Sequence, residues 1–214
     1  MITLGFSDQD ATVEPVAALP TLAFRLQVAE ATGQAIHAML LRYQIRLEAR
    51  RRAYSADEQA RLFDLFGAAG RWGETLTSLA WTQGVVMVPE FQGRVEVSLP
   101  VALSYDLEVA AGRYFDALQD GEIPLVFLFS GSVFVKGPTG LQVEQVPWDR
   151  EAAFRLPVRR WRDAMDRHFP GGGWLRLRRE SLEALARFKT RRALLTWDET
   201  IMALVDACEA GARR

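Results

Sequence analysis

The stretch Ile123-Pro-Leu-Val-Phe-Leu-Phe-Ser-Gly-Ser-Val-Phe-Val135 is the most apolar part of this chain of 214 residues. Its β-branched and aromatic side chains favour a strand over a helix. A run this apolar predicts a central strand that is covered on both faces. It is shorter than the roughly 20 residues that a membrane-spanning helix needs. The stretch therefore indicates a soluble sheet protein built around one buried strand.

Further strands are predicted from the alternation of apolar and polar residues, which marks a strand with one buried face. Alternation or apolar runs of this kind occur over residues 22–28, 41–47, 79–88, 95–101 and 141–145. The short connections suit antiparallel neighbours. Residues 1–20 hold two prolines and three acidic residues, and we expect them to be irregular or partly extended.

Helices are predicted from capping residues and helical spacing. Capping boxes at Ser55 and Thr196 start two helices at about residues 56 and 197. Apolar residues at helical spacing predict three more helices, over residues 107–119 with Asp106 as N-cap, over 158–169 after Pro157, and from Ser181. The inward face of the last helix is expected to carry Trp197, Ile201, Leu204, Val205 and Cys208.

The predicted fold class is α+β: an antiparallel β-sheet or sandwich of about six strands with intervening helices, followed by a helical C-terminal third. Two parts are expected along the chain. Residues 1–157 form the sheet-rich body, and residues 158–214 form a basic helical segment that packs on it.

The charge of the chain is unevenly distributed, although the net charge is only -1. Residues 1–149 carry 11 basic and 18 acidic groups, whereas residues 150–192 carry 13 basic and 5 acidic groups. Nearly all the basic residues are arginine, which suits paired carboxylates and protein interfaces. The basic segment is expected to meet either an acidic partner or the acidic first part of the same chain.

No catalytic, cofactor-binding or metal-ligating residue is predicted. Ser130 and Ser132 lie within a strand and not on the strand-to-helix turn of a nucleophile elbow. Cys208 is interpreted as a small core residue, and His37 and His168 as structural or surface residues. One cysteine and two histidines are too few for the usual zinc or iron–sulfur sites. We expect no cofactor and no metal. The alternative hypothesis of an enzyme with an unrecognised site is retained.

Tryptophan and arginine are concentrated in the C-terminal third. Trp161 and Trp197 lie on apolar helical faces and are expected in the core, whereas Trp148 and Trp174 lie in loop-like contexts. Exposed tryptophan beside arginine is typical of protein interfaces. The predicted partner-binding residues are Trp148, Trp174, Arg176, Arg178, Arg179, Arg191 and Arg192. Nucleic acid is disfavoured by the pI near 6.2.

The chain also resembles a known family over about residues 12 to 208. The matching phrases are Ala35 to Arg46, Trp81 to Pro89, Ile123 to Gly131, Gly137 to Trp148, Met165 to Pro170 and Gly173 to Arg178. They look like an uncharacterised bacterial domain-of-unknown-function family, of actinobacterial type, associated with gene neighbourhoods of nickel–iron uptake hydrogenases. The resemblance implies a cytoplasmic accessory or assembly protein whose partner is a hydrogenase subunit or precursor. It supplies no catalytic residues.

A second resemblance concerns only the order of elements. Residues 21–135 run as strands, a helix and an apolar strand, which is similar to the bacterial secretion chaperone fold. That resemblance implies a holdase for unfolded clients, as an alternative to the accessory protein. The N-terminal residues lack a signal peptide's charge and apolar core, so we expect a cytoplasmic protein without a membrane partner. The sequence does not indicate an oligomeric state.

Overall fold

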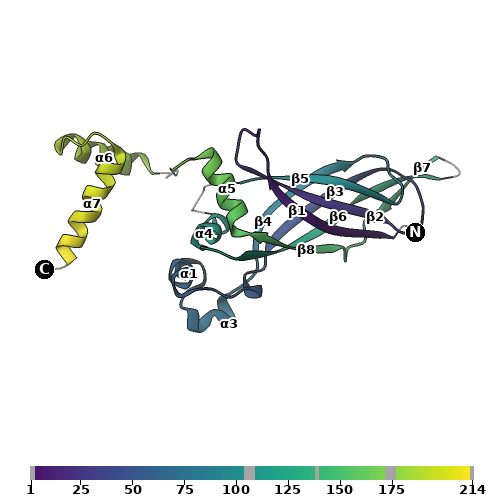
Figure 1. Ribbon diagram of the computed structural model, residues 1–214, viewed down its shortest axis with the longest axis horizontal. Helices are drawn as coiled ribbons and strands as arrows, with labels where there is room; N and C mark the ends of the chain where they lie inside the picture. Colours follow the sequence, from purple (N-terminus) through teal and green to yellow (C-terminus); the bar gives the residue numbers. More distant parts are fainter. Residues whose placement is uncertain (1–2, 104–108, 138–139, 172–176, 213–214) are drawn as a thin grey trace. The chain divides into compact units, whose positions relative to one another are not determined.

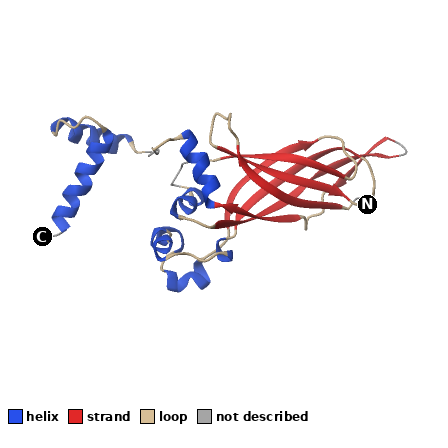
Figure 2. Ribbon diagram, in the orientation of Figure 1, coloured by secondary structure: helices blue, strands red, loops and turns tan. Residues whose placement is uncertain are grey.

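The computed structural model describes residues 3–103, 109–137, 140–171 and 177–212 (Figure 1). The chain divides into two compact units, Met1–Gly173 and Trp174–Arg214. In the described part of the chain, all strands belong to the first unit, and the second is helical (Figure 2). The boundary between the units follows Gly173, whereas the sequence predicted it after residue 157. The difference arises because helix α5 (Val158–His168) buries its apolar face in the first unit.

Two antiparallel sheets form the core of the first unit. The smaller sheet has the order β1-β2-β5, with bounds Leu4–Val13 (β1), Thr21–Glu30 (β2) and Arg94–Ala102 (β5). The larger sheet has the order β4-β3-β6-β7 with β8 also paired to β6, and its strands are Ile36–Leu47 (β3), Leu79–Val88 (β4), Glu122–Gly137 (β6), Gly140–Gln145 (β7) and Glu151–Pro157 (β8). The predicted α+β class with antiparallel strands is confirmed, with eight strands among the described residues where about six were predicted.

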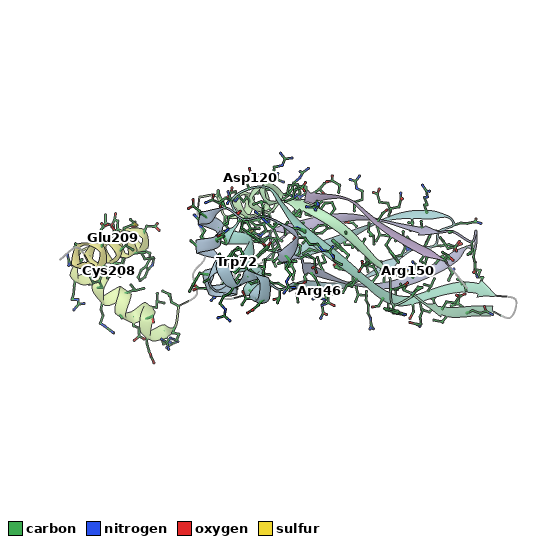
Figure 3. All side chains as sticks on the ribbon, turned by 90° about the horizontal axis from the view of Figure 1, so that it is seen from below. Arg46, Trp72, Asp120, Arg150, Cys208 and Glu209 are labelled. Carbon is green, nitrogen blue, oxygen red and sulfur yellow. The ribbon has the colours of Figure 1, made fainter. Side chains whose placement is uncertain are left out.

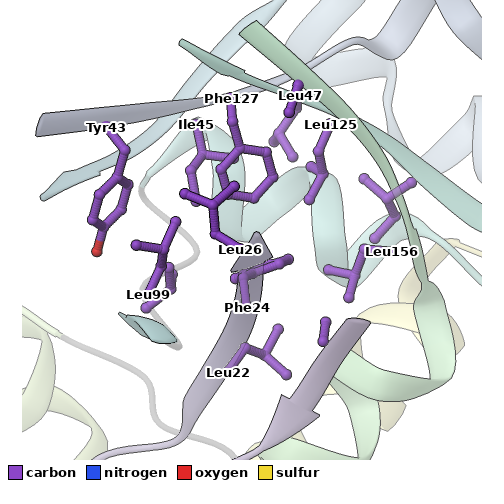
Figure 4. Packing of buried hydrophobic residues seen from close by; sticks show 14 of the residues in the cluster. Leu22, Phe24, Leu26, Tyr43, Ile45, Leu47, Leu99, Leu125, Phe127 and Leu156 are labelled. Carbon is purple, nitrogen blue, oxygen red and sulfur yellow. The ribbon is translucent and has the colours of Figure 1, made fainter. Parts of the chain in front are cut away.

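Strand β6 is the predicted central strand. It pairs with β3 on one side and with β8 and then β7 on the other. From β6, Phe127 and Phe129 reach the smaller sheet: the Phe127 ring centroid lies 5.2 Å from that of Phe24, and the Phe129 centroid 4.4 Å from that of Phe6. Figure 4 shows Phe127 packed among the leucines of both sheets. Burial of these rings holds the sheets together.

The two strands that the sequence did not predict are β1 and β8. In β1, Leu4 and Phe6 face the core at even positions, whereas Ala11 and Val13 face it at odd positions, because the register with β2 shifts between Asp8 and Asp10. Such a bulge interrupts the alternation that identifies a strand. β8 is short, contains two alanines and ends at Pro157, so its apolar alternation is weak.

Strand β6 changes its partner at Gly131. Residues 122–128 of β6 pair with β8, and residues 132–137 pair with β7. The Val146 backbone N–H donates to the Gly131 carbonyl at 2.9 Å. Gly131 has φ +145°, and a Cβ there would collide with the carbonyl oxygen of Leu40 on β3. The Ser130-Gly-Ser132 sequence therefore marks the point where β6 changes its partner, and the close backbone approach there requires glycine.

Short helices follow β3 and precede β6. They are η1 (Ala49–Arg51), α1 (Ala56–Arg61), α2 (Phe63–Phe66), η2 (Ala69–Arg71), α3 (Trp72–Thr75) and α4 (Ala110–Ala117). The Ser55 capping box is confirmed, since the Glu58 backbone N–H donates to Ser55 Oγ at 3.2 Å. The predicted helix 107–119 corresponds to the shorter α4, whose N-cap is Val109 and not the predicted Asp106, which lies outside the described residues. Helix α5 packs on α4 through a stacked Phe115–Trp161 pair at 5.6 Å.

The second unit contains α6 (Arg179–Arg191) and α7 (Trp197–Ala212), which contact each other. The predicted capping box of α7 is confirmed: the Glu199 backbone N–H donates to Thr196 Oγ1 at 3.1 Å. The segment between α6 and α7 is held by Lys189 Nζ, which donates to the Leu194 carbonyl at 2.9 Å. The predicted packing of this segment on the body stays a prediction.

Candidate protein-binding surfaces

Trp148 lies in the loop between β7 and β8 and is 94% exposed. The backbone on both sides of the loop is anchored to β6: Val146 N–H donates to Gly131, and Phe129 N–H donates to the Arg150 carbonyl at 3.0 Å. Val146 itself is buried. An exposed tryptophan on an anchored loop loses little freedom when a partner covers it, which suits an interface anchor.

The predicted arginines of the C-terminal segment lie at both ends of α6. Arg178 and Arg179 are the N-cap and first residue, Arg191 is the last residue, and Arg192 is the C-cap. All four are exposed. We call these four residues, with the exposed Arg187, the arginine face; at about 100° per residue they lie around α6 and not on a single side of it. Trp174 and Arg176 lie outside the described residues.

The structure does not bring all predicted site residues together within one unit. Trp148 belongs to the first compact unit, whereas the arginine face belongs to the second. Arg191 and Arg192 sit favourably at the helix C-terminus, but Arg178 and Arg179 are at the end where positive charge is disfavoured. Both are exposed, so their guanidinium groups are accessible to an acidic group of a partner.

Helix α7 exposes apolar residues that the sequence predicted to face inward. Trp197, Ile201 and Val205 are 46%, 41% and 43% exposed. Cys208, labelled on α7 in Figure 3, is also exposed. The prediction was wrong for these four residues, which we call the apolar stripe, because α6 covers a different side of α7. The side of α7 toward α6 carries the buried Thr200 and the half-buried Leu204. The predicted burial of Trp161 is confirmed.

The outer face of the larger sheet also exposes apolar side chains, which the sequence analysis did not identify as a surface. Four exposed residues define this sheet face, Val85 and Met87 on β4 and Leu141 and Val143 on β7. A depression of about 550 Å³ beside Val85 is lined by polar and apolar side chains, including those of Arg42, Gln44 and Leu128. The available signal was the unbroken apolar run at the end of β4, where both faces are apolar.

A buried polar cluster lies where the short helices meet. Arg52 Nη2 donates to Glu58 Oε1 at 2.8 Å, and the Gln119 backbone N–H donates to the same oxygen at 2.9 Å. The Tyr54 and Tyr114 hydroxyls lie 2.8 Å apart. Burial raises the pKa of both tyrosines, so both remain neutral at ordinary pH. These bonds join α1 to α4, which is a structural role.

The two histidines make local contacts. His168 Nε2 lies 3.1 Å from the Ala17 carbonyl and Nδ1 3.3 Å from the Ala164 carbonyl, so the ring connects α5 to the segment before β2. His37 Nδ1 lies 3.2 Å from an exposed Glu90 carboxylate. Both arrangements fit the structural or surface roles expected from the sequence.

Two clefts border α5. One, of about 290 Å³, is lined by the side chains of Arg61, Asp116, Arg162 and Asp166 among others. The other, of about 560 Å³, is lined by Arg160, Asp163, Asp166 and Arg167 with Thr12 and Val13. Each contains two arginines and two aspartates, so neither has the one-signed charge that concentrates an ionic ligand.

In the described ranges, no three His, Cys, Asp or Glu side chains gather as a metal site requires. Within those same ranges, no helix combines the length and the apolar content needed to cross a membrane.

The fold and surfaces define a two-sheet antiparallel α+β protein that presents apolar and arginine-rich surfaces. Over residues 1–213 the chain matches the model of a family of unknown function (DUF6084), and it belongs to that family. This confirms the predicted membership of an uncharacterised domain family. No curated protein matches the chain.

Solved structures give distant similarities. A CARDB domain from Pyrococcus furiosus, solved in complex with di-metal ions, is 8% identical with TM-score 0.29, over 73% of this chain and 92% of that chain. A putative late embryogenesis abundant protein is 14% identical with TM-score 0.32, over 72% of each chain. A β-glucosidase from Kluyveromyces marxianus is 10% identical with TM-score 0.26, over 72% of this chain and 15% of that chain. At these TM-scores the similarities carry no argument about function.

Proposed function

We propose that the protein is a non-enzymatic cytoplasmic accessory or assembly protein that binds another protein through the arginine face of α6. The supporting observation is the exposure of all five arginines of this face. Between Arg178 and Arg192 the chain carries six basic and two acidic residues. Arginine binds carboxylates in bidentate pairs, so the complementary surface is an acidic region of a folded protein.

Trp148 is proposed as a second anchor for the same partner. Tryptophan and arginine are the residues most enriched among those that dominate binding energy. The proposed partner is a component of a nickel–iron hydrogenase, a subunit or its precursor. The support for this identity is the family resemblance and its gene neighbourhoods, whereas the charge of α6 supports only an acidic partner.

A holdase for unfolded clients is the second candidate function. The observation that favours it is the sheet face, where Val85, Met87, Leu141 and Val143 are each more than half exposed. Exposed apolar surface of this kind attracts apolar segments of other chains. A holdase would suppress aggregation of a denatured test protein, and Met87→Glu with Val143→Glu would remove that effect while Arg178→Glu would not.

The arginine face is tested with the tagged full chain in its native host. Arg178→Glu with Arg179→Glu reverses two charges, and acidic residues at a helix N-terminus favour the helix, so α6 should stay folded. The matched control is Arg71→Glu with Arg159→Glu, which makes the same charge change at exposed arginines of the first unit.

We expect the first pair to lose an acidic partner that the wild type and the control pair both retain. Binding of the purified partner should weaken by at least roughly 100-fold for the first pair, since each of the two arginines lost can contribute about 1.5–3 kcal/mol through charged hydrogen bonds. Retention of the partner by the first pair contradicts the proposal that the arginine face binds it. Loss with both pairs indicates a general charge effect and contradicts it as well. Identification of the lost partner as a hydrogenase subunit or precursor supports the proposed identity of the partner.

A further inference from the structure

Strand β4 is an outermost strand of the larger sheet, and one of its two edges has no partner strand. Among the described residues, its backbone hydrogen bonds to other strands go only to β3. The register with β3 shifts at Trp81, so the regular part of the edge is residues 82–88. Unpaired backbone N–H and C=O groups along such an edge form a template for another extended segment.

The sequence of β4 lacks the features that protect an edge. Natural proteins protect exposed edges with charged side chains or prolines, because an unprotected edge pairs with other chains. β4 contains neither. The other edge strands of the described sheets do contain them, namely Asp8 and Asp10 in β1, Arg94, Glu96 and Pro100 in β5, Glu144 in β7, and Glu151, Arg155 and Pro157 in β8. Residues 82–88 are therefore the edge best suited to accept a strand.

The side chains on the outer face of β4 indicate what such a strand would carry. Val85 and Met87 are 58% and 59% exposed, and Val85 lies beside Arg42 in the register with β3. Arg42 is the one charged side chain among the described residues that line the depression at Val85. Within the described part of the chain, Arg42 forms no ion pair. Apolar side chains of an added strand would pack on Val85 and Met87, and an acidic one would meet Arg42.

We propose that β4 binds an extended segment of another protein as an additional strand, and that this segment carries apolar residues and an acidic residue that pairs with Arg42. An added strand lies two strand spacings, about 10 Å, from β3, and extended arginine and glutamate side chains together span this distance. β4 of a second copy would bring no acidic residue, so charge complementarity favours another protein. The inference does not depend on the arginine face, which belongs to the other unit.

Binding of a labelled peptide to the full chain tests this inference. The probe is the acetylated peptide Val-Thr-Glu-Thr-Val-Thr-Glu-Thr-Val, which as a strand places its valines and glutamates on one face. The comparison peptide has lysine in place of both glutamates. Fluorescence anisotropy should show the glutamate peptide binding at least roughly tenfold more tightly than the lysine peptide, and Arg42→Gln should remove that preference. Because Arg42 is exposed, circular dichroism of the variant should match the wild type.

A pair of matched variants separates the edge of β4 from the rest of the sheet face. Val85→Glu places a carboxylate beside Arg42 and should weaken binding of the glutamate peptide by roughly tenfold or more. Val143→Glu makes the same charge change on β7, where Val143 is 55% exposed, and should leave binding unchanged. A peptide that lay across the sheet face, rather than along β4, would be weakened by both variants.

Hydrogen exchange followed by mass spectrometry locates the bound peptide. Strand addition pairs the outward N–H groups of β4, so exchange over residues 82–88 should slow several-fold with the glutamate peptide, while exchange in β1 and β5 should not change.

Absence of binding at about 1 mM glutamate peptide overturns the inference. Binding that leaves exchange over residues 82–88 unchanged also overturns it, as does equal weakening by Val85→Glu and Val143→Glu. Equal binding of the two peptides contradicts the acidic occupant and overturns it as well. A wild type that dimerises without peptide, and protects residues 82–88 as its concentration rises, would show that a second copy occupies the edge, which is a further refutation.

Discussion

Replacing Phe127 by alanine removes a ring that is 0% exposed and lies between the two sheets. The ring centroid is 5.2 Å from that of Phe24 across the sandwich and 6.3 Å from that of Phe129 along β6. Truncation of a buried phenylalanine costs about 3–5 kcal/mol, because the transfer free energy of the ring is lost and a cavity remains. The range of about 3–5 kcal/mol already includes lost aromatic contacts, and the two contacts of Phe127 place the expected loss in its upper part, at about 4–5 kcal/mol.

Equilibrium unfolding in urea, followed by tryptophan fluorescence, measures this loss. The midpoint should fall while the slope with denaturant stays unchanged. The matched control is Phe63→Ala on α2, where the ring is 60% exposed and the expected loss is below about 1 kcal/mol. If Phe127→Ala also loses less than about 1 kcal/mol, or no more than Phe63→Ala, then β6 is not the central strand of the core and the reasoning fails.

Three other predictions concern single sites. Gly131→Ala should lower the free energy of unfolding in urea by about 2 kcal/mol or more, because the φ of +145° and the adjacent β3 carbonyl both exclude a Cβ. The control is Gly70→Ala, which has open space around it and should stay within about 0.5 kcal/mol of wild type. Arg52→Met should lower the free energy of unfolding by about 3–5 kcal/mol, because it leaves the buried Glu58 carboxylate without its cation. Adding Glu58→Met should recover part of that stability. A double-mutant cycle without recovery would contradict the Arg52–Glu58 pairing. Burial raises the pKa of Glu30, but hydrogen bonds from the following turn outweigh it and hold the pKa below its ordinary 4.5. The contribution of Glu30 to stability is therefore full above pH 4.5 and is lost as the pH falls through the lowered pKa, so Glu30→Gln should flatten the fall in melting temperature between about pH 5 and 2; an unchanged acid limb would refute this.

The candidate surfaces were predictable only in part. Trp148 was identified from its loop-like sequence context, and the structure places it in a loop with 94% exposure. The arginines of α6 were identified from local charge, which burial rarely hides. The sheet face was missed because an apolar run at the end of β4 is equally compatible with a strand covered on both faces.

The sequence by itself determined the features that depend on neighbouring residues. The capping boxes at Ser55 and Thr196 are hydrogen bonds within one turn, so the side chains that form them are specified locally. The apolar stretch that became β6 predicted a central strand because no other position could bury it. The α+β class followed from the order of these elements.

Only the tertiary structure decided what covers each face. Trp161 and Trp197 both lie on apolar sides of amphipathic helices, yet Trp161 is 7% exposed beneath α4 and Trp197 is 46% exposed on α7. The bulge in β1 and the change of partner at Gly131 likewise depend on strands that are distant in sequence. Periodicity specifies which side of an element is apolar, but burial requires a second surface, and that surface comes from another part of the chain or from another molecule.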